Sequence, residues 1–354
     1  MVIRSGFNRL IELWDRYERP LAAISLVIGF TFDLFLARRP DNLLNNILLL
    51  SYLGLAALLI IVLNRRTYRN EEEPQATPLF LLLVLQFCFG GLASNMLVLY
   101  GKSGTFAGSA LFILLLFGML VGNEFLKSRY TYLRFNIVVY YTLLLTYCIV
   151  AVPTFILHAV GTWVFLASGA LSLAIIAGFL WLVYLIVFRG RNRGAQIYEV
   201  SVLVALVFVF YNLLYFMNII PPVPLALRDI GVYHSLSRIT EQAAGQNSAI
   251  YTATYEKAHW WQFWRGTSST YTVFVTGQAA CFSSVFAPTN LSAPIYHRWE
   301  KRDEAQEKWM TVSRISFDIS GGRDAGYRGF TTSAVTPGRW RCDVETENGA
   351  LIGR

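Results

Sequence analysis

The sequence predicts an α-helical polytopic membrane domain of about seven helices, followed by a C-terminal all-β, immunoglobulin-like sandwich domain. Three observations lead to this prediction. Seven long apolar runs fill the first 220 residues, a polar segment of 133 residues (222–354) follows them, and only 15% of residues are charged. Soluble domains carry about 25% charged residues. The low charge and a mean hydropathy of +0.45 therefore indicate that much of the chain lies in lipid.

Each apolar run is about as long as a helix that crosses a bilayer. Such a helix needs about 17 to 25 apolar residues and satisfies its own backbone hydrogen bonds in lipid. The stretch between the fifth and sixth runs (154–161) is predicted to be either a tight turn or a re-entrant segment, which leaves the helix count over 131–188 open. The predicted membrane domain covers 20–220, with runs at Leu21–Ala37, Leu43–Leu63, Pro78–Leu99, Thr105–Val121, Phe135–Pro153, Thr162–Phe188 and Val200–Ile220.

Basic residues are divided unequally between the two sets of loops. The N-terminal segment and the second, fourth and sixth loops hold 13 Lys and Arg, and the loops between them hold 3. Short loops rich in Lys and Arg stay in the cytoplasm. The sequence therefore predicts a multi-pass plasma-membrane protein with a cytoplasmic N-terminus and, after seven crossings, an external C-terminal domain. The net charge of +8 mainly reflects these loops, and no nucleic-acid partner is expected.

Residues 1–19 are predicted to form a cytoplasmic amphipathic helix. Their apolar side chains, from Ile3 to Tyr17, fall on one helical face and their charges on the other. This pattern is typical of a helix that lies in the membrane interface. The sequence at Ala37–Pro40 is a poor cleavage site, so the first apolar run is predicted to be an uncleaved anchor.

Polar residues within the apolar runs are few. Asp33 is the only carboxylate there, and an intramembrane charge is a functional candidate by default. Pairing with Arg38 or simple hydration is the alternative, because Asp33 lies four residues before the end of its run. Amides in membrane helices more often join helices than bind substrates. The candidate intramembrane polar site consists of Asp33, Gln86, Asn95 and Asn212.

The polar segment is predicted to form antiparallel strands. Residues 221–270 are interpreted as an exit linker with the first strands, and 271–354 as the core of an extracytoplasmic β domain. Its runs are rich in Thr, Val, Tyr and Trp, and turn residues separate them, as in a sandwich or small barrel. The predicted strands are Val232–Ile239, Ala249–Lys257, Thr270–Val275, Ala279–Val285, Ile295–Lys301, Trp309–Ile319, Gly326–Ala334 and Arg339–Glu345.

Cys281 and Cys342 are the only cysteines in the polar segment, and Trp299 lies between them. Outside the cytoplasm a disulfide persists, and the order Cys, Trp, Cys is that of the immunoglobulin core. A bridge closing 61 residues would contribute on the order of 3 to 4 kcal/mol. Two unpaired, buried thiols are the alternative.

Several motifs of the polar segment together resemble a bacterial family, the domain of unknown function 2914, in members where a multi-spanning half precedes the domain. The motifs are Cys281–Thr289, Ile295–Trp299, Arg314–Ile315, Gly321–Phe330 and Pro337–Val344, within about 75 residues (280–354). The resemblance implies a protein of the bacterial cell envelope, in the inner membrane. It implies no activity.

Two surface features are candidates for binding. Gly321–Gly326 is predicted to be a hairpin turn with a local Arg–Asp pair, or an anion site built from Arg323, Asp324, Arg328 and loop amides. Four of the five residues 260–264 are aromatic, and Trp prefers the membrane interface. These candidate interface aromatics, with core packing as the alternative, are Trp260, Trp261, Phe263 and Trp264.

Motifs of hydrolases, zinc enzymes and nucleotide-binding proteins are absent from the sequence. We therefore expect no enzyme activity, cofactor or metal. The leading hypothesis is a non-enzymatic membrane protein whose external domain binds an envelope protein, peptidoglycan or lipid. A small-substrate transporter or channel is the first alternative, which a wet cavity around the intramembrane polar residues would favour. A membrane-embedded enzyme is the second, which needs polar groups converging at one membrane face. Partner identity and oligomeric state stay open.

Overall fold

The computed structural model describes residues 30–31, 33–35, 39–69, 79–125, 132–188, 194–243, 246–257, 260–261, 268, 272 and 277–354. The predicted helix over 1–19, most of the first apolar run and most of the predicted strand Thr270–Val275 lie outside these residues. The chain divides into two compact units. The first contains Met1–Leu99, Ile113–Cys148 and Ser168–Asn212, and the second Tyr100–Phe112, Ile149–Ala167 and Leu213–Arg354.

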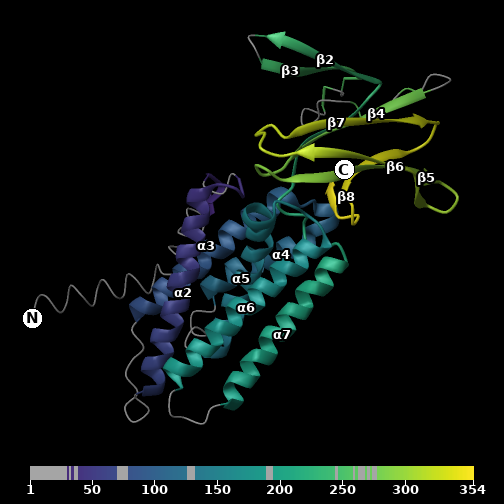
Figure 1. Cartoon of the computed structure of the whole chain (residues 1–354). Coiled ribbons are helices and arrows are strands. Elements are labelled where there is room, and N and C mark those ends of the chain that lie inside the picture. The colour runs from purple at the N-terminus through teal and green to yellow at the C-terminus, as the bar shows by residue number, and fades with distance from the viewer. Residues whose placement is uncertain are drawn as a thin grey trace, which may run out of the picture. The chain divides into compact units, whose positions relative to one another are not determined.

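The second to seventh apolar runs are long α-helices (Figure 1). Among the residues that the structure describes, five helices are long and apolar enough to cross a membrane, namely α2, α3, α5, α6 and α7, and α4 contains a shorter apolar helix, Gly108–Asn123. This confirms a polytopic helical membrane domain. The helices are α2 (Leu43–Arg69), α3 (Leu79–Ser103), α4 (Phe106–Phe125), α5 (Leu133–Ala151), α6 (Thr162–Val187) and α7 (Gly194–Phe216).

The fifth and sixth apolar runs form two separate helices. α5 continues into one π-helical turn, η2 (Val152–Leu157), and α6 begins at Thr162. Between them His158 (φ 50°) and Gly161 (φ 131°) adopt left-handed backbone conformations that end the first helix and reverse the chain. Of the two predictions for this stretch, the tight turn is confirmed.

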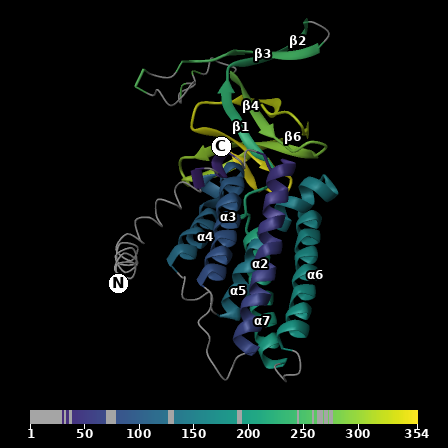
Figure 2. The same cartoon turned by 90° about the vertical axis from the view of Figure 1, so that its left-hand side faces the viewer.

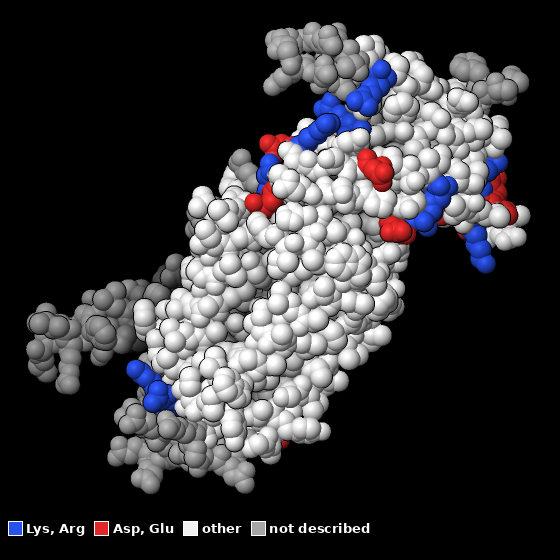
Figure 3. Space-filling view, viewed as in Figure 1, with Lys and Arg blue, Asp and Glu red and all other residues white. Residues whose placement is uncertain are grey.

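The helices expose large apolar side chains to a degree that water would not tolerate. Leu44 (76%), Phe87 (65%) and Trp181 (63%) are among the exposed ones. On the face drawn in Figure 3, the helix surfaces are almost wholly uncharged, and Lys, Arg, Asp and Glu gather over the strands and at helix ends. Apolar patches of this extent need lipid as their solvent, so the chain is an integral membrane protein.

The C-terminal segment is all-β. Its strands form a three-stranded sheet in the order β1-β4-β7, a four-stranded sheet in the order β6-β5-β8-β9 and a separate β2–β3 ribbon, which Figure 2 also shows. Every strand pair is antiparallel. The strands are β1 (Ala226–Tyr233), β2 (Ser235–Ala243), β3 (Gln246–Thr254), β4 (Gly277–Phe286), β5 (Ser292–Asp303), β6 (Lys308–Ser320), β7 (Tyr327–Val335), β8 (Trp340–Thr346) and β9 (Leu351–Gly353).

The two larger sheets pack face to face over a shared apolar core. Val285 of β4 packs in one buried cluster with Ile295 of β5, Val344 of β8 and Ile352 of β9. Alternate residues of β5 are buried at Ile295, His297 and Trp299, which is the period of a strand with one face in a core. The predicted sandwich is therefore present.

One predicted strand is misplaced, and one observed strand was not predicted. The predicted strand Val232–Ile239 crosses the break between β1 and β2, and β1 begins earlier, at Ala226. β1 contains Asp229 and Gly231, two residue types that are rare in strands, so its sequence concealed it. β9 was not predicted, because three residues are too short for a recognisable alternation.

The turn after β8 lies against helix ends that belong to the same compact unit. Gly349 has φ 79°, a left-handed conformation that suits glycine in a tight turn. Asn348 Nδ2 donates to Thr162 Oγ1 (2.9 Å) and to Tyr215 Oη (3.2 Å). The ring of Tyr215 stacks on that of Phe165 at 3.7 Å, which joins the first turn of α6 to the last turn of α7.

Candidate functional site

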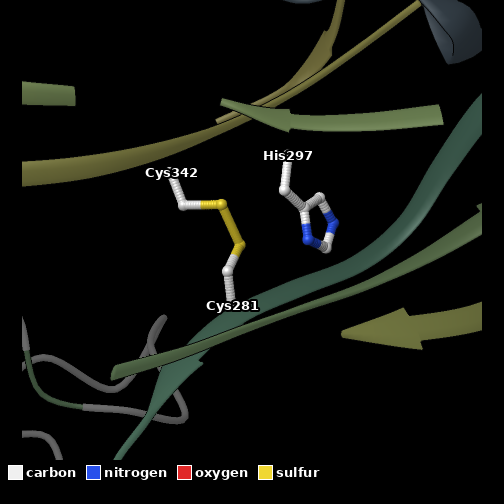
Figure 4. A group of neighbouring side chains, drawn as sticks. All are labelled: Cys281, His297 and Cys342. Carbon is white, nitrogen blue, oxygen red and sulfur yellow. A yellow bond between two sulfur atoms is a disulfide. The ribbon is translucent and has the colours of Figure 1, made fainter. Parts of the chain in front are cut away.

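A disulfide links the two sheets at the centre of the β domain. Cys281 of β4 and Cys342 of β8 are bonded, with Cα atoms 6.4 Å apart (Figure 4). Trp299 is 1% exposed and packs with both cysteines, Ala279 and Val335 in one buried cluster. The predicted bridge and its neighbouring tryptophan are confirmed.

His297 is the buried polar group beside this bridge (Figure 4). Ser283 Oγ lies 2.7 Å from its Nε2 and Thr331 Oγ1 lies 2.9 Å from its Nδ1. Trp299 Nε1 also donates to Thr331 Oγ1, at 3.2 Å. Burial lowers the pKa of His297 to about 4, because the charged ring would lose its water without gaining an anion. The imidazole is therefore neutral and ties β5 to the facing sheet.

Cys281, His297 and Cys342 place a possible ligand atom each within 4.8 Å of one another. Such a set could hold zinc only with both cysteines as free thiolates and the histidine ring neutral. Here the two sulfurs are bonded to each other, and both ring nitrogens of His297 have hydrogen-bond partners. In the oxidised domain this cluster is a structural core and offers no free metal ligand.

The other face of the four-stranded sheet carries rows of charged side chains. Strand register places Arg298 opposite Arg314 on one side and opposite Asp343 on the other. The next row pairs Glu300 with Arg341. We call this surface the arginine face, and it consists of Arg298, Glu300, Arg302, Arg314, Arg339, Arg341, Asp343, Glu345 and Arg354.

The carboxylates of the arginine face are buried beneath guanidiniums. Arg354 donates to both oxygens of Asp343, at 2.7 and 2.8 Å, and Arg298 donates to one of them at 3.1 Å. Burial alone would raise the pKa of Asp343, but the hydrogen bonds and charges of Arg354, Arg298 and Arg341 outweigh it, so that pKa is lowered. Asp343 is therefore ionised, and its charge is held by three arginines.

Aromatic rings support two of these arginines from the side. The guanidinium of Arg314 lies 3.9 Å from the ring centre of Tyr296, and that of Arg341 lies 4.2 Å from that of Trp309. Arg314 also donates to Glu345 Oε1 and to the backbone carbonyls of Thr346 and Glu347. Each planar group is thus fixed by a carboxylate and a ring, which is the arrangement that favours Arg over Lys.

The predicted anion site around Arg323 is differently built. Gly321 and Gly322 donate their amides to the carbonyls of Leu291 and Ala287, and Gly326 donates to that of Arg323. A side chain at Gly321 would collide with the Pro288 carbonyl at 1.8 Å, so these glycines allow a close backbone approach. The segment joins β6 of one sheet to β7 of the other, so the hairpin interpretation is wrong.

The side chains predicted for that anion site lie at the surface. Arg323, Asp324 and Arg328 are all exposed. The guanidinium of Arg323 lies 5.4 Å from the ring centre of Tyr327. Arg328 lies in β7 and its carbonyl accepts from Tyr251. An anion site here stays a prediction. The amides of Gly321, Gly322 and Gly326 could not contribute to it, because they already donate to backbone carbonyls.

The predicted interface aromatics lie partly outside the described residues, which do not include Phe263 and Trp264. Trp260 is 91% exposed and Trp261 51% exposed. Exposed tryptophans are uncommon on a domain that meets only water. Contact with a membrane interface stays a prediction.

The predicted intramembrane polar residues make separate local pairs. Gln86 Nε2 donates to the Asn123 carbonyl, Asn95 exchanges amide hydrogen bonds with Asn45, and Asn212 donates to Phe208 of its own helix. Asp33 lies beside Ser94. The bonds of Gln86 and Asn95 join neighbouring helices, whereas the bond of Asn212 stays within α7. The cavity around these residues that would favour a transporter stays untested.

The arginine face was missed by the sequence analysis, although its signal is present in the sequence. Arg298 and Glu300 flank Trp299, and the charged residues of Arg341–Glu345 alternate with Cys342 and Val344. This is the period of a strand with one face in a core. An ordinary solvated face has the same pattern, and only strand register reveals which charges meet.

Helices, disulfide and charged sheet together define a class, namely polytopic membrane proteins with an oxidised β-sandwich domain. Residues 292–354 match the model of the family described as protein of unknown function (DUF2914), which confirms the resemblance over the C-terminal region. The match contains all nine members of the arginine face. No curated protein and no solved structure matches the chain.

Proposed function

We propose that this chain is a multi-pass protein of the bacterial inner membrane, whose β domain lies outside the cytoplasm and binds a partner in the cell envelope without catalysing a reaction. The helices anchor the domain in the bilayer. The observation that carries the proposal is the arginine face, on which fixed guanidiniums cover one side of an exposed sheet. Such surfaces serve recognition better than they serve stability alone, since buried ion pairs often add little net stability.

The external location has two independent supports. The N-terminal segment and the loops predicted on its side of the membrane hold 13 Lys and Arg, and the loops predicted on the other side hold 3. The basic side of such a protein stays in the cytoplasm. The bridge between Cys281 and Cys342 is of a kind that persists in oxidising compartments. A reporter fused after Arg354 tests this placement. We expect activity from a reporter that needs an oxidising compartment, and activity of a cytoplasm-only reporter would overturn it.

Site-specific crosslinking in intact cells tests partner binding. Ser316 is exposed on β6 and pairs with Tyr296, so a photo-reactive residue there samples the arginine face. Thr332 is exposed on β7 and pairs with Ala280 in the other sheet, so the same residue there is the matched control. We expect a defined envelope component to be captured from Ser316 and not from Thr332. Equal capture from both positions, or none, would contradict the proposal.

A further inference from the structure

The arginine face hides its carboxylates and presents its guanidiniums. The side chains of Asp343, Glu345 and Glu300 are 0%, 2% and 6% exposed. Those of Arg298, Arg314, Arg341 and Arg354 are 29%, 36%, 21% and 38% exposed. A molecule that approaches this sheet therefore meets a cationic layer, although most of its charges are paired below.

Two further arginines extend this layer. The register that pairs Glu300 with Arg341 brings Arg302 opposite Arg339, and the Arg302 amide donates to the Arg339 carbonyl at 2.9 Å. Alternation along β5 puts the Arg302 side chain on the arginine face, and Arg339, directly before β8, continues the register of that strand. Within the described part of the chain, neither guanidinium has a hydrogen bond or an ion pair. The nine residues of the face are thus six arginines and three buried carboxylates, and the exposed Asp318 follows Arg314 and Ser316 on the same side of β6.

The face is also prepared for binding before a ligand arrives. Rings and carboxylates fix Arg314 and Arg341 in place, so little side-chain freedom remains to be lost. One buried contact is incomplete. Arg298 Nε and Glu345 Oε2 lie 3.2 Å apart, yet among the described residues neither atom has a hydrogen-bond partner. Both atoms are buried, so an arriving carboxylate or phosphate would be bound by the partly exposed guanidiniums of the face.

We infer that the arginine face binds an extended polymer that carries repeated anionic groups, either carboxylates or phosphates. The inference rests on the proposed function and names the chemistry of its partner. Arg314 lies in β6, Arg298 in β5 and Arg354 directly after β9, so they border a sheet of four neighbouring strands, β6-β5-β8-β9. At about 4.8 Å per strand the row spans about 14 Å, which is wider than one anion. Several charged groups of one chain can therefore be held at once.

Polymer binding to the full-length protein in nanodiscs of neutral phosphatidylcholine tests this inference. The probes are fluorescent polyglutamate and polyphosphate, with dextran as the uncharged control. The R302Q/R339Q double variant removes two guanidiniums that hold no carboxylate, so the fold is kept. The matched control, R228Q/R238Q, removes the same charge from exposed positions on β1 and β2.

We expect both anionic polymers to bind wild type more tightly than dextran does, and added salt to weaken them. R302Q/R339Q should lower affinity at least about tenfold, and R228Q/R238Q by less than about twofold. The better of the two polymers identifies carboxylate or phosphate as the natural group. Equal losses in the two double variants would show unspecific attraction and overturn the inference, as would binding no stronger than that of dextran. Capture from Ser316 without polymer binding would overturn only the ligand class, whereas failure of capture would overturn the proposed function itself.

Discussion

The helices and the β domain both bury polar side chains, but they satisfy them with different chemistry. In the helices the buried partners are neutral. Asn45 and Asn95 exchange amide hydrogen bonds at 2.9 and 3.2 Å, and the Thr146 and Tyr211 hydroxyls meet at 3.1 Å. In the β domain the most buried acids, Asp343 and Glu345, form ion pairs with arginines.

The difference follows from the solvent of each region. A charge buried among membrane helices loses its hydration water, so burying it costs much free energy and neutral hydrogen-bonded pairs are preferred there. The arginines of the β domain keep about a fifth to two fifths of their side chains in water, so their ion pairs are only half desolvated. Polar chemistry thus follows the medium, and substitutions in each region can break or sharpen this contrast.

The largest effect is expected from the disulfide, which has no counterpart among the described helical cysteines. Cys88 and Cys148 are free and buried. In the C281A/C342A double variant, the free energy of unfolding of the β domain should fall by about 3 to 4 kcal/mol, because 61 residues are no longer closed into a loop. Urea unfolding of the purified protein in detergent measures this loss. A dithiol reductant should reproduce it in wild type and leave the double variant unchanged; an unshifted urea midpoint would contradict it.

His297 is the neutral buried group of the β domain, and it should make that domain sensitive to acid. Its pKa is lowered from the ordinary 6.5 to about 4, so the folded domain binds fewer protons than the unfolded chain between these values. Stability is complete above pH 6.5 and falls by on the order of 3 kcal/mol as the pH drops to about 4. H297Q should remove this dependence when unfolding is followed across the range. H234Q, at the partly exposed His234, is the control that should retain it.

Asp343 tests the ionic side of the comparison. D343N keeps the shape but removes the charge that holds Arg354, Arg298 and Arg341, and the unfolding free energy should fall by about 2 kcal/mol. Denaturant titration measures the loss, and D318N at an exposed position of β6 should change it little. Because the two partners share one interaction, D343N/R354Q should lose less than the sum of the single variants. Additive losses would show that the pair is not coupled.

Hydropathy, alternation and residue counts predicted the helices, most strands and the bridge between Cys281 and Cys342. Helices and strands follow from the local periodicity of apolar residues, and the bridge follows from there being only two cysteines in the polar segment; both can be read directly in the sequence. The turn at His158–Gly161 was one of two open alternatives, because a short neutral stretch fits both a turn and a re-entrant segment. The structure shows the turn, because both His158 and Gly161 have left-handed backbone conformations there, which the sequence does not reveal.

The arginine face could not be predicted, because its pairs depend on register between strands far apart in sequence. Arg298 meets Asp343 across 45 residues, and a bulge after Trp299 sets which β6 residue lies opposite Glu300. A slip of one residue would turn the charged side chains into the core. The sequence shows the alternation, whereas the packing of both sheets around the disulfide selects the register.

The smallest effect is expected in the helices, where neutral pairs replace ion pairs. N95A leaves the Asn45 amide without its partner, and the helical domain should lose about 1 kcal/mol. N45A/N95A should lose less than the two single variants together, because no orphaned amide remains. Unfolding with sodium dodecyl sulfate in mixed micelles measures these differences. N212A is the matched control: among the described residues, the Asn212 side chain bonds only the Phe208 carbonyl of its own helix, so N212A should lose less than N95A. If N212A and N95A were equally destabilising, the Asn45–Asn95 pair would contribute no more than a bond within one helix. The contrast between neutral pairs that join helices and ion pairs that join strands would then be refuted.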